Sequence, residues 1–370
     1  MSKTTIDDKR PLLGEWLAAK LSLGRLSVTR LAANAGAGFS AETIYADIEY
    51  EDSGARREKH LVVRRQNEGS DLFLNSDLNV PYRTMAAIRE KSSIPVPAVV
   101  GIEFDRSILG APFLVMEKMP GRVVAQSPNY NKEGWVKDLE PARRGEVWHN
   151  ALRLLAQIHK IDCRSGFEFL NQGLGAQQGL NHYLKWVEEW YLWARRDRPH
   201  PITDVALTYL KRACPKESPT ALLWGDPTPS NVLFLDDLSV SAAIDWEMAA
   251  LGPPEVDLAW WLFFDDLFSL GMNVARLEGL PDRNTTISWY ESFLGRKAQN
   301  MDYYDVLARF RLAIVGMRAV DRQIGLGSIP ATTTARTHAP IMRMLAQRLG
   351  EPQPEVGEDF FAFMAALGMH

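Results

Sequence analysis

The sequence predicts an α+β protein with two lobes, a small β-rich lobe followed by a larger and mainly helical one. At 370 residues the chain is too long for one ordinary hydrophobic core. Strand-like runs dominate the chain up to residue 118, whereas stretches with helical periodicity dominate it after Pro141. We therefore expect an N-terminal lobe over residues 1–118, a C-terminal lobe over 119–350 and a tail over 351–370.

The N-terminal lobe is expected to join a leading helix to an antiparallel sheet. Apolar residues at helical spacing predict a helix over Arg10–Leu31. Its apolar side consists of Leu12, Trp16, Leu17, Leu21 and Leu26. The runs Glu42–Tyr50 and His60–Arg65 predict two strands joined by a polar turn, and a helix is expected around Tyr82–Lys91. The segments IPVPAVVGIEF and APFLVMEKMPG predict two more strands.

The C-terminal lobe contains three long segments with helical periodicity. These are PARRGEVWHNALRLLAQIHKID, LNHYLKWVEEWYLWARR and YYDVLARFRLAIVGMRAVDRQI. Apart from one hairpin, helices are expected to make up this lobe. The tail begins with EPQPE, which is typical of a linker, and ends in a short amphipathic segment.

Composition excludes several classes of protein. The net charge of −4 argues against nucleic-acid binding as the main task. Cys163 and Cys214 are the only cysteines, so no disulfide framework is expected and a reducing compartment fits. The N-terminus lacks the apolar core of a signal peptide, and no window resembles a membrane span. We expect a cytoplasmic protein with no membrane or nucleic-acid partner, either a monomer or a homodimer.

A predicted hairpin lies within the segment LWGDPTPSNVLFLDDLSVSAAIDWEMAALGPPEVD. The apolar runs Val232–Leu235 and Val240–Ile244 are separated by a polar turn, which predicts two antiparallel strands. Because a hairpin returns the chain to its starting point, Asp245 is expected beside Asn231.

Three polar residues of this segment have the spacing that phosphoryl transfer requires. Asp226 and Asn231 are five positions apart in one loop, and the hairpin adds Asp245. Asn231 and Asp245 offer oxygen ligands for Mg²⁺, while Asp226 accepts or orients the proton of an attacking hydroxyl. The alternative is that Asp226 and Asn231 only form a turn, as Gly, Asp, Pro, Ser and Asn commonly do.

With these residues in place, the chain resembles the aminoglycoside-phosphotransferase-like kinases, which phosphorylate small molecules. The pattern of that family is His-Gly-Asp, four residues, Asn, a hairpin, and an Asp followed by an aromatic and an acidic residue. The match extends to GPPEVDLAW and, more loosely, over Leu31–Leu349. The branch it resembles includes the kinase-like domains fused to acyl-CoA dehydrogenases in animals. The resemblance implies a bilobal protein-kinase-like fold with ATP and Mg²⁺ bound in the cleft.

The resemblance also implies residues that contact the nucleotide. NAGAGFSAETIY is similar to the family's phosphate loop, with Gly36 and Gly38 allowing close approach and Ser40 adding a hydroxyl. Arg64 occupies the strand position that normally holds a phosphate-binding lysine, and Arg65 follows it. For each segment an alternative to phosphate binding stays open. The loop could be a simple glycine turn, and the arginines could be solvated side chains at the end of a strand.

Further positions follow from the same resemblance. In VMEKM, backbone groups of Glu117, Lys118 and Met119 would meet the adenine edge. Glu247 either reaches a second metal or bonds nearby backbone. Asp257 is expected to brace the catalytic loop.

The chain departs from the family pattern at three places. Trp224 replaces the usual histidine, which we expect to alter packing more than chemistry. The acidic partner of the basic strand residue falls near Pro81, so that ion pair is in doubt. Thr228 stands where many kinases carry a cation that neutralises the transferred phosphoryl group. His159 is expected to be structural.

The acceptor of the phosphoryl group is not evident from the sequence. One face of a predicted helix carries three tryptophans, Trp186, Trp190 and Trp193. They either pack in the core or line the substrate site. Acidic residues that could make the acceptor side negative are Glu188, Glu189, Asp265 and Asp266. A partly apolar alcohol, such as a hydroxyacyl compound, fits the composition better than a polycation. The competing functions are a nucleotide-binding pseudokinase and an antibiotic phosphotransferase for aminoglycosides or macrolides.

Overall fold

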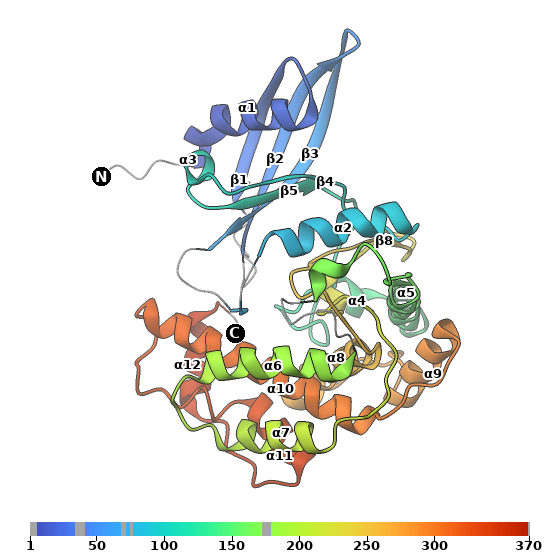
Figure 1. The fold of residues 1–370 in the computed structure, drawn as a ribbon, viewed down its shortest axis with the longest axis vertical. Coiled ribbons are helices and arrows are strands. Elements are labelled where there is room, and N and C mark those ends of the chain that lie inside the picture. The colour runs from blue at the N-terminus through green and yellow to red at the C-terminus, as the bar shows by residue number, and fades with distance from the viewer. Residues whose placement is uncertain (1–5, 34–40, 68–71, 75–76, 172–178, 369–370) are drawn as a thin grey trace. The chain divides into compact units, whose positions relative to one another are not determined.

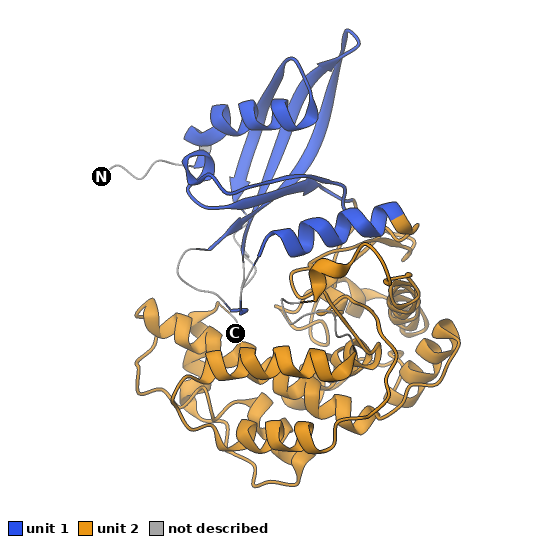
Figure 2. Ribbon diagram, in the orientation of Figure 1, with its two compact units in different colours: residues 1–90, 96–119 blue, residues 91–95, 120–370 orange. Residues whose placement is uncertain are grey.

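The computed structural model describes residues 6–33, 41–67, 72–74, 77–171 and 179–368 (Figure 1). The chain divides into two compact units, which Figure 2 distinguishes by colour. Unit 1 comprises Met1–Glu90 and Val96–Met119, and unit 2 comprises Lys91–Pro95 and Pro120–His370. A β-sheet dominates unit 1 and helices dominate unit 2, which confirms the predicted α+β class.

Unit 1 is built on a five-stranded antiparallel sheet in the order β1-β2-β3-β5-β4. The strands are β1 (Leu26–Ala33), β2 (Ala41–Asp52), β3 (Ala55–Gln66), β4 (Val99–Glu103) and β5 (Phe113–Glu117). β2 and β3 form a long hairpin that turns at Ser53 and Gly54, both with positive φ. This conformation matches the right-handed twist of the strands it joins. The strands predicted from the sequence are therefore confirmed.

The predicted helix over Arg10–Leu31 is wrong in its second half. Helix α1 (Arg10–Leu21) ends at Ser22, which has a left-handed backbone with φ 55°. The chain then continues as β1, whose residues pair with β2. The β-branched Val28 and Thr29 favour a strand, and this pairing outweighs the helical spacing of the leucines. Leu12 points away from the core and is 41% exposed.

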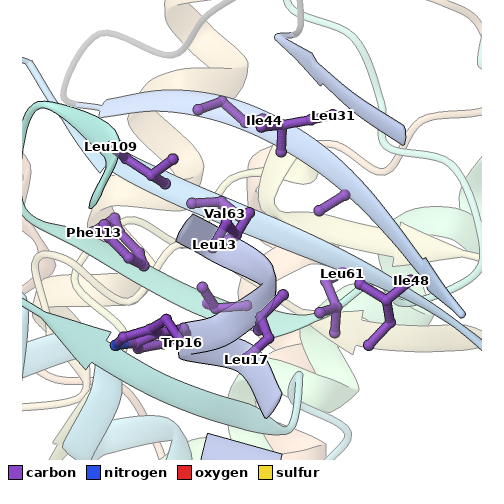
Figure 3. Packing of buried hydrophobic residues seen from close by; sticks show 12 residues of the cluster. Leu13, Trp16, Leu17, Leu31, Ile44, Ile48, Leu61, Val63, Leu109 and Phe113 are labelled. Atoms are coloured by element: carbon purple, nitrogen blue, oxygen red, sulfur yellow. The ribbon is translucent and has the colours of Figure 1, made fainter. Parts of the chain in front are cut away.

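One face of the sheet is covered by α1, as Figure 3 shows. Leu13, Trp16 and Leu17 of the helix are buried against this face. The sheet contributes Leu31, Ile44, Ala46, Ile48, Leu61, Val63, Phe113 and Val115. Because side chains alternate along a strand, Thr43, Tyr45, Val62 and Arg64 belong to the opposite face. Unit 1 also contains the short helices η1 (Ile6–Lys9) and α3 (Arg106–Leu109), and α2 (Asn79–Lys91), whose last residue belongs to unit 2.

Unit 2 is organised around the long helix α10 (Met301–Gly325), which packs against α6, α7, α8 and α11. The α-helices of unit 2 besides α10 are α4 (Trp135–Asp138), α5 (Pro141–His159), α6 (Leu180–Arg195), α7 (Pro201–Arg212), α8 (Glu255–Asp266), α9 (Arg283–Leu294), α11 (Pro340–Leu349) and α12 (Glu358–Ala366). Shorter turns are η2 (Glu168–Leu170), η3 (Pro229–Asn231) and the π-helical η4 (Leu267–Gly271). The three long predicted helices correspond to α5, α6 and α10.

Two small sheets interrupt the helices of unit 2. Strands β7 (Val232–Phe234) and β8 (Val240–Ala243) form the predicted hairpin. A second pair, β6 (Ala221–Leu223) with β9 (Ala250–Gly252), was not predicted. At three residues each, these strands are too short to show a periodic pattern. Within the described ranges, no helix combines the length and the apolar character that a membrane crossing needs.

Candidate functional site

The loop that carries Asp226 begins directly after β6 and is held at its start by a buried carboxylate. Trp224 N and Gly225 N donate to Asp257 Oδ2 and Oδ1 at 2.7 and 3.1 Å. Asp257 lies in the first turn of α8 and is completely buried. Both peptide N–H groups that precede Asp226 are therefore fixed from α8.

Asp257 has a further partner in His159, at the end of α5. His159 Nε2 lies 3.1 Å from Asp257 Oδ2, and His159 Nδ1 lies 2.7 Å from the Tyr290 hydroxyl. A carboxylate oxygen can only accept, so His159 Nε2 carries a proton and donates to Asp257. Burial raises the pKa of Tyr290 well above its usual value, so its hydroxyl keeps a proton that it can donate to His159 Nδ1. His159 was expected to be structural; it lies in the network that holds Asp257.

Gly225 occupies a position that other residues do not fit. Its φ is 90°, and an added Cβ would overlap the backbone carbonyl of Met248. Glycine is the residue that adopts this conformation without steric cost. The carbonyl of Gly225 accepts a hydrogen bond of 2.6 Å from Arg311 Nη2. The N–H and the carbonyl of Gly225 are thus both hydrogen-bonded to buried side chains, those of Asp257 and Arg311.

Asp226 is partly buried, and each of its carboxylate oxygens accepts one hydrogen bond. Trp260 Nε1 donates to Oδ1 at 2.6 Å, and Asn231 Nδ2 donates to Oδ2 at 2.8 Å. Burial raises the pKa of the Asp226 carboxyl, and these two hydrogen bonds partly offset the rise. The carboxylate keeps unused lone pairs, so it can still accept the proton of a hydroxyl. Trp260 was not predicted, although it follows Asp257 by three positions on one helix face.

The hairpin brings Asp245 back to Asn231, as predicted. Ile244 N donates to Asn231 O at 2.9 Å, and Val232 pairs with Ala243. Asp245 follows with a left-handed backbone, φ 63°, a conformation that Asp tolerates better than most residues. Glu247, two positions later, is partly buried.

The donor set suits a hard cation. Asn231 Nδ2 is committed to Asp226, where it bonds both the side chain and the backbone oxygen (2.9 Å). This fixes the amide orientation and leaves Asn231 Oδ1 as the side-chain atom that could bind a cation. Together with the Asp245 carboxylate it would give an all-oxygen donor set, the kind that Mg²⁺ prefers. Among the residues that the structure describes, no cluster of three or more His, Cys, Asp or Glu could hold a metal alone. Mg²⁺ typically completes such a sparse set with phosphate oxygens and water.

Trp224 links the two segments that carry the acidic residues. Its Nε1 donates to Ile244 O at 2.9 Å, and its ring stacks on Trp246 with centroids 5.5 Å apart. The replacement of the family histidine therefore changes packing between the loop and the end of the hairpin. Thr228 is buried, and its hydroxyl bonds that of Ser230 at 2.8 Å. It supplies no charge.

The predicted phosphate-binding residues belong to unit 1. Gly36, Gly38 and Ser40 lie outside the described residues. On β3, Arg64 Nη1 donates to Thr43 Oγ1 at 2.9 Å. Its neighbour Arg65 is not a solvated side chain, because it forms an ion pair with Glu42 and donates to Leu109 O at 2.7 Å.

The segment predicted to meet adenine is partly used within the sheet. Glu117 N donates to Ala98 O at 2.8 Å, and Lys118 N donates to His60 O at 2.9 Å. The Lys118 N–H is therefore already used, since the strand pairing continues through it. For the described ranges, the backbone bonds include no acceptor for Met119 N. Met119 N is thus the backbone donor of this segment that remains for a ligand.

The acidic residues expected on the acceptor side are largely neutralised. Asp265 accepts from Arg276 Nη2 at 2.6 Å and from the Tyr130 hydroxyl at 3.2 Å. Asp266 pairs with Arg309 at 3.2 Å. Further out, Glu188 bonds Lys211 at 2.7 Å, whereas Glu189 is exposed. These pairings remove most of the negative potential that a polycation would need.

The tryptophan stripe of α6 belongs mainly to the core. Trp186 and Trp190 are buried and stack on each other with centroids 5.6 Å apart. Trp193 is partly buried beneath Arg318, whose guanidinium lies 4.1 Å from the ring centre. Core packing therefore accounts for Trp186 and Trp190, whereas Trp193 is covered by Arg318.

Proteins of the acyl-CoA dehydrogenase family are similar in sequence to this chain over most of its length. Mouse acyl-CoA dehydrogenase family member 10 is 26% identical over 274 residues, which cover 70% of this chain. Human acyl-CoA dehydrogenase family member 11 is 23% identical over 272 residues, which cover 71% of it. The matched regions span only 24% and 34% of those two proteins.

Solved structures show the same fold. A putative aminoglycoside phosphotransferase from Ralstonia eutropha superposes with a TM-score of 0.61 at 20% identity, covering 92% of this chain and 98% of that one. Plasmodium vivax ethanolamine kinase gives 0.56 at 13% identity, covering 87% and 82%. A mutant of aminoglycoside phosphotransferase APH(4)-Ia, in a ternary complex with ADP and hygromycin B, gives 0.51 at 15% identity, covering 96% and 98%. The fold is therefore that of the bilobal kinase-like phosphotransferases.

The family assignment rests on a match longer than half of the chain. The model of the phosphotransferase enzyme family APH matches residues 50–290, which include every residue discussed around Asp226 except Arg311. The chain belongs to the APH phosphotransferase enzyme family.

Proposed function

We propose that this protein is an ATP- and Mg²⁺-dependent phosphotransferase that moves the γ-phosphate to a hydroxyl group of a small molecule. The observation that carries the proposal is the geometry around Asp226. One carboxylate oxygen is fixed by Trp260 and the other by Asn231, in a loop braced by Asp257. A carboxylate held in this way is oriented but still able to accept a proton.

In the proposed reaction the acceptor hydroxyl attacks the γ-phosphorus in line, and its proton goes to Asp226 as the bond to the leaving oxygen of ADP breaks. Burial raises the pKa of the Asp226 carboxyl, which makes it a stronger base than an exposed aspartate. Asn231 Oδ1 and the Asp245 carboxylate would hold Mg²⁺. When bound, the ion supplies charge neutralisation at the phosphates. Glu247 is proposed to support this set.

ATP is proposed as the phosphoryl donor. Arg64 presents a guanidinium on β3, and its bond to Thr43 orients the group. Met119 N and the carbonyl of Glu117 are proposed to meet the adenine edge. The roles of Gly36, Gly38 and Ser40 rest on the sequence resemblance. The complex of APH(4)-Ia with ADP and hygromycin B supports nucleotide use in this fold.

The acceptor is proposed to be a partly apolar alcohol, with a hydroxyacyl compound as the first choice. Asp265 and Asp266 are paired with arginines, so they offer little to a polycationic aminoglycoside. Relatives named for acyl-CoA also favour an acyl acceptor. We propose that the protein acts in the cytoplasm, as a monomer or homodimer.

The test measures ATP consumption in the presence of Mg²⁺ with a panel of hydroxylated acids, acyl thioesters, amino alcohols, aminoglycosides and macrolides. Wild type is compared with Asp226→Ala and with Asp236→Ala. Asp236 is a matched control, since it is a fully exposed aspartate in the turn of the same hairpin. Turnover that persists in Asp236→Ala and disappears in Asp226→Ala supports the proposal. ATP binding without turnover on any acceptor would instead identify a pseudokinase.

A further inference from the structure

Arg311 is a buried cation in the middle of α10, next to the loop that carries Asp226. It is completely buried, and its Nη2 donates to Gly225 O at 2.6 Å. Its Nε and Nη1 have no hydrogen-bond partner among the residues that the structure describes. No ion pair joins Arg311 to an acidic side chain in the same ranges. The charge of Arg311 does act at longer range on Asp226, where it counters part of the rise in pKa that burial causes. A guanidinium buried without an ion pair is still costly, so its presence at this place calls for a physical explanation.

Aromatic rings supply part of that explanation. The guanidinium carbon of Arg311 lies 4.3 Å from the centre of the Trp260 ring and 5.8 Å from that of Tyr183. A cation over the face of an indole is attracted by the ring quadrupole, most strongly when both groups are shielded from water. Trp260 is itself almost fully buried. The stacking therefore fixes both the guanidinium and the indole plane.

The same two contacts lead to Asp226 from two directions. Trp260 Nε1, on the ring that Arg311 covers, donates to Asp226 Oδ1 at 2.6 Å. Gly225 O, which Arg311 binds, belongs to the peptide group that joins Gly225 to Asp226. A positive charge over the indole face also withdraws electron density and makes the N–H a better donor. Arg311 thus contacts one backbone group and one side chain that together set the direction of the carboxylate.

We propose that Arg311 is a positioning residue for Asp226, acting through the Gly225 carbonyl and the Trp260 indole. The proposal rests on the role given to Asp226 in the proposed phosphoryl transfer. Arg311 does not touch substrate in this scheme, because it is completely buried. Its loss should therefore lower kcat and leave the KM for ATP nearly unchanged.

Two substitutions separate positioning from a purely structural role. Arg311→Lys keeps a positive charge but loses the planar group that stacks on Trp260. Trp260→Phe keeps a ring beneath Arg311 but removes the N–H that binds Asp226. The matched control is Arg318→Lys, the same change on the same helix, at an arginine that stacks on Trp193 instead (4.1 Å).

In the active-enzyme arm, we expect kcat to fall about 10- to 100-fold in Arg311→Lys and in Trp260→Phe. The double variant should lose little more than either single variant, because both act on one carboxylate. The KM for ATP should stay within about twofold, and Arg318→Lys should resemble wild type. Unchanged kcat in correctly folded Arg311→Lys and Trp260→Phe would overturn the proposal.

A second arm does not depend on turnover and uses the indole N–H resonance of Trp260 in the proton NMR spectrum. The short bond to a carboxylate places this resonance downfield. Its assignment follows from its absence in Trp260→Phe. It should move upfield in Arg311→Lys and stay in place in Arg318→Lys. If wild type turns over no acceptor, the proposed function fails while this resonance still tests the link from Arg311 to Asp226. A resonance that is the same in wild type and Arg311→Lys would refute that link.

Discussion

Replacing Asp257 by asparagine would test whether this residue braces the loop that carries Asp226. Asp257 Oδ2 accepts from Trp224 N and His159 Nε2, and Oδ1 accepts from Gly225 N. An asparagine has the same shape, but one of its two ends is an NH₂ group that cannot accept a hydrogen bond. The asparagine oxygen is expected at the position of Oδ2, where it can accept both hydrogen bonds. The NH₂ group then takes the position of Oδ1 and faces Gly225 N–H, from which it cannot accept.

The magnitude follows from counting these contacts. One buried N–H would lose its partner, which costs about 1–3 kcal/mol, and two bonds would change from a charged to a neutral acceptor at about 1 kcal/mol each. Removing a buried charge offsets part of this loss. We therefore expect Asp257→Asn to lower the free energy of unfolding by about 3 kcal/mol and, for a chain of 370 residues, the Tm by roughly 4 °C.

Urea unfolding followed by circular dichroism would measure the change. Asp282→Asn is the matched control, because Asp282 caps α9 through Thr285 N at 2.7 Å and asparagine caps equally well. The control should stay within about 0.5 kcal/mol of wild type. An Asp257→Asn variant as stable as the control would show that the buried carboxylate does not brace the loop.

Three further predictions concern other parts of the chain. Gly225→Ala should abolish ATP consumption, since the added methyl group overlaps the Met248 carbonyl; a variant with half of the wild-type rate would contradict this. Burial lowers the pKa of His200 from 6.5 to about 4, so the unfolded chain binds this proton first and stability should fall as the pH drops from about 6.5 to 4. After allowance for solvent screening, the part of the loss due to His200, measured in urea titrations as the difference between wild type and His200→Gln, should be about 2 kcal/mol. Arg64→Ala should raise the KM for ATP at unchanged stability, whereas Arg65→Ala should lower Tm because it breaks the ion pair with Glu42. The reverse pattern would show that Arg65 binds the phosphates and that Arg64 stabilises the sheet.

Local patterns in the sequence were sufficient for some elements and misleading for others. The hairpin after Asn231 was predictable, because two apolar runs and the polar turn between them lie close together in the sequence. The helix over Arg10–Leu31 failed because leucines of the strand β1 happen to continue the helical spacing. Pairing with β2, which decides the outcome, involves residues that lie farther along the chain.

The same limit applies to the site. Asp226, Asn231 and Asp245 could be found from spacing, because one loop and one hairpin contain them. Trp260 binds Asp226 from 34 positions away, and Arg311 binds Gly225 from 86 positions away. No local pattern relates these residues, since tertiary packing of α8 and α10 brings them to the loop. In the sequence Arg311 is one of several charged residues of its helix, with Asp305 and Arg309 nearby, so nothing distinguishes it before the fold is known.

The stacked pair Trp224 and Trp246 has a consequence for local opening. These rings, with the bond from Trp224 Nε1 to Ile244 O, tie the segment before Asp226 to the segment around Asp245. Parts of a protein that share such contacts open as one cooperative unit in amide hydrogen exchange. The amides of Trp224, Gly225 and Ile244 should therefore exchange with one common opening free energy. The proposed proton acceptor, Asp226, and the proposed metal ligand, Asp245, would then be lost or kept together, with no partly opened state that retains only one of them.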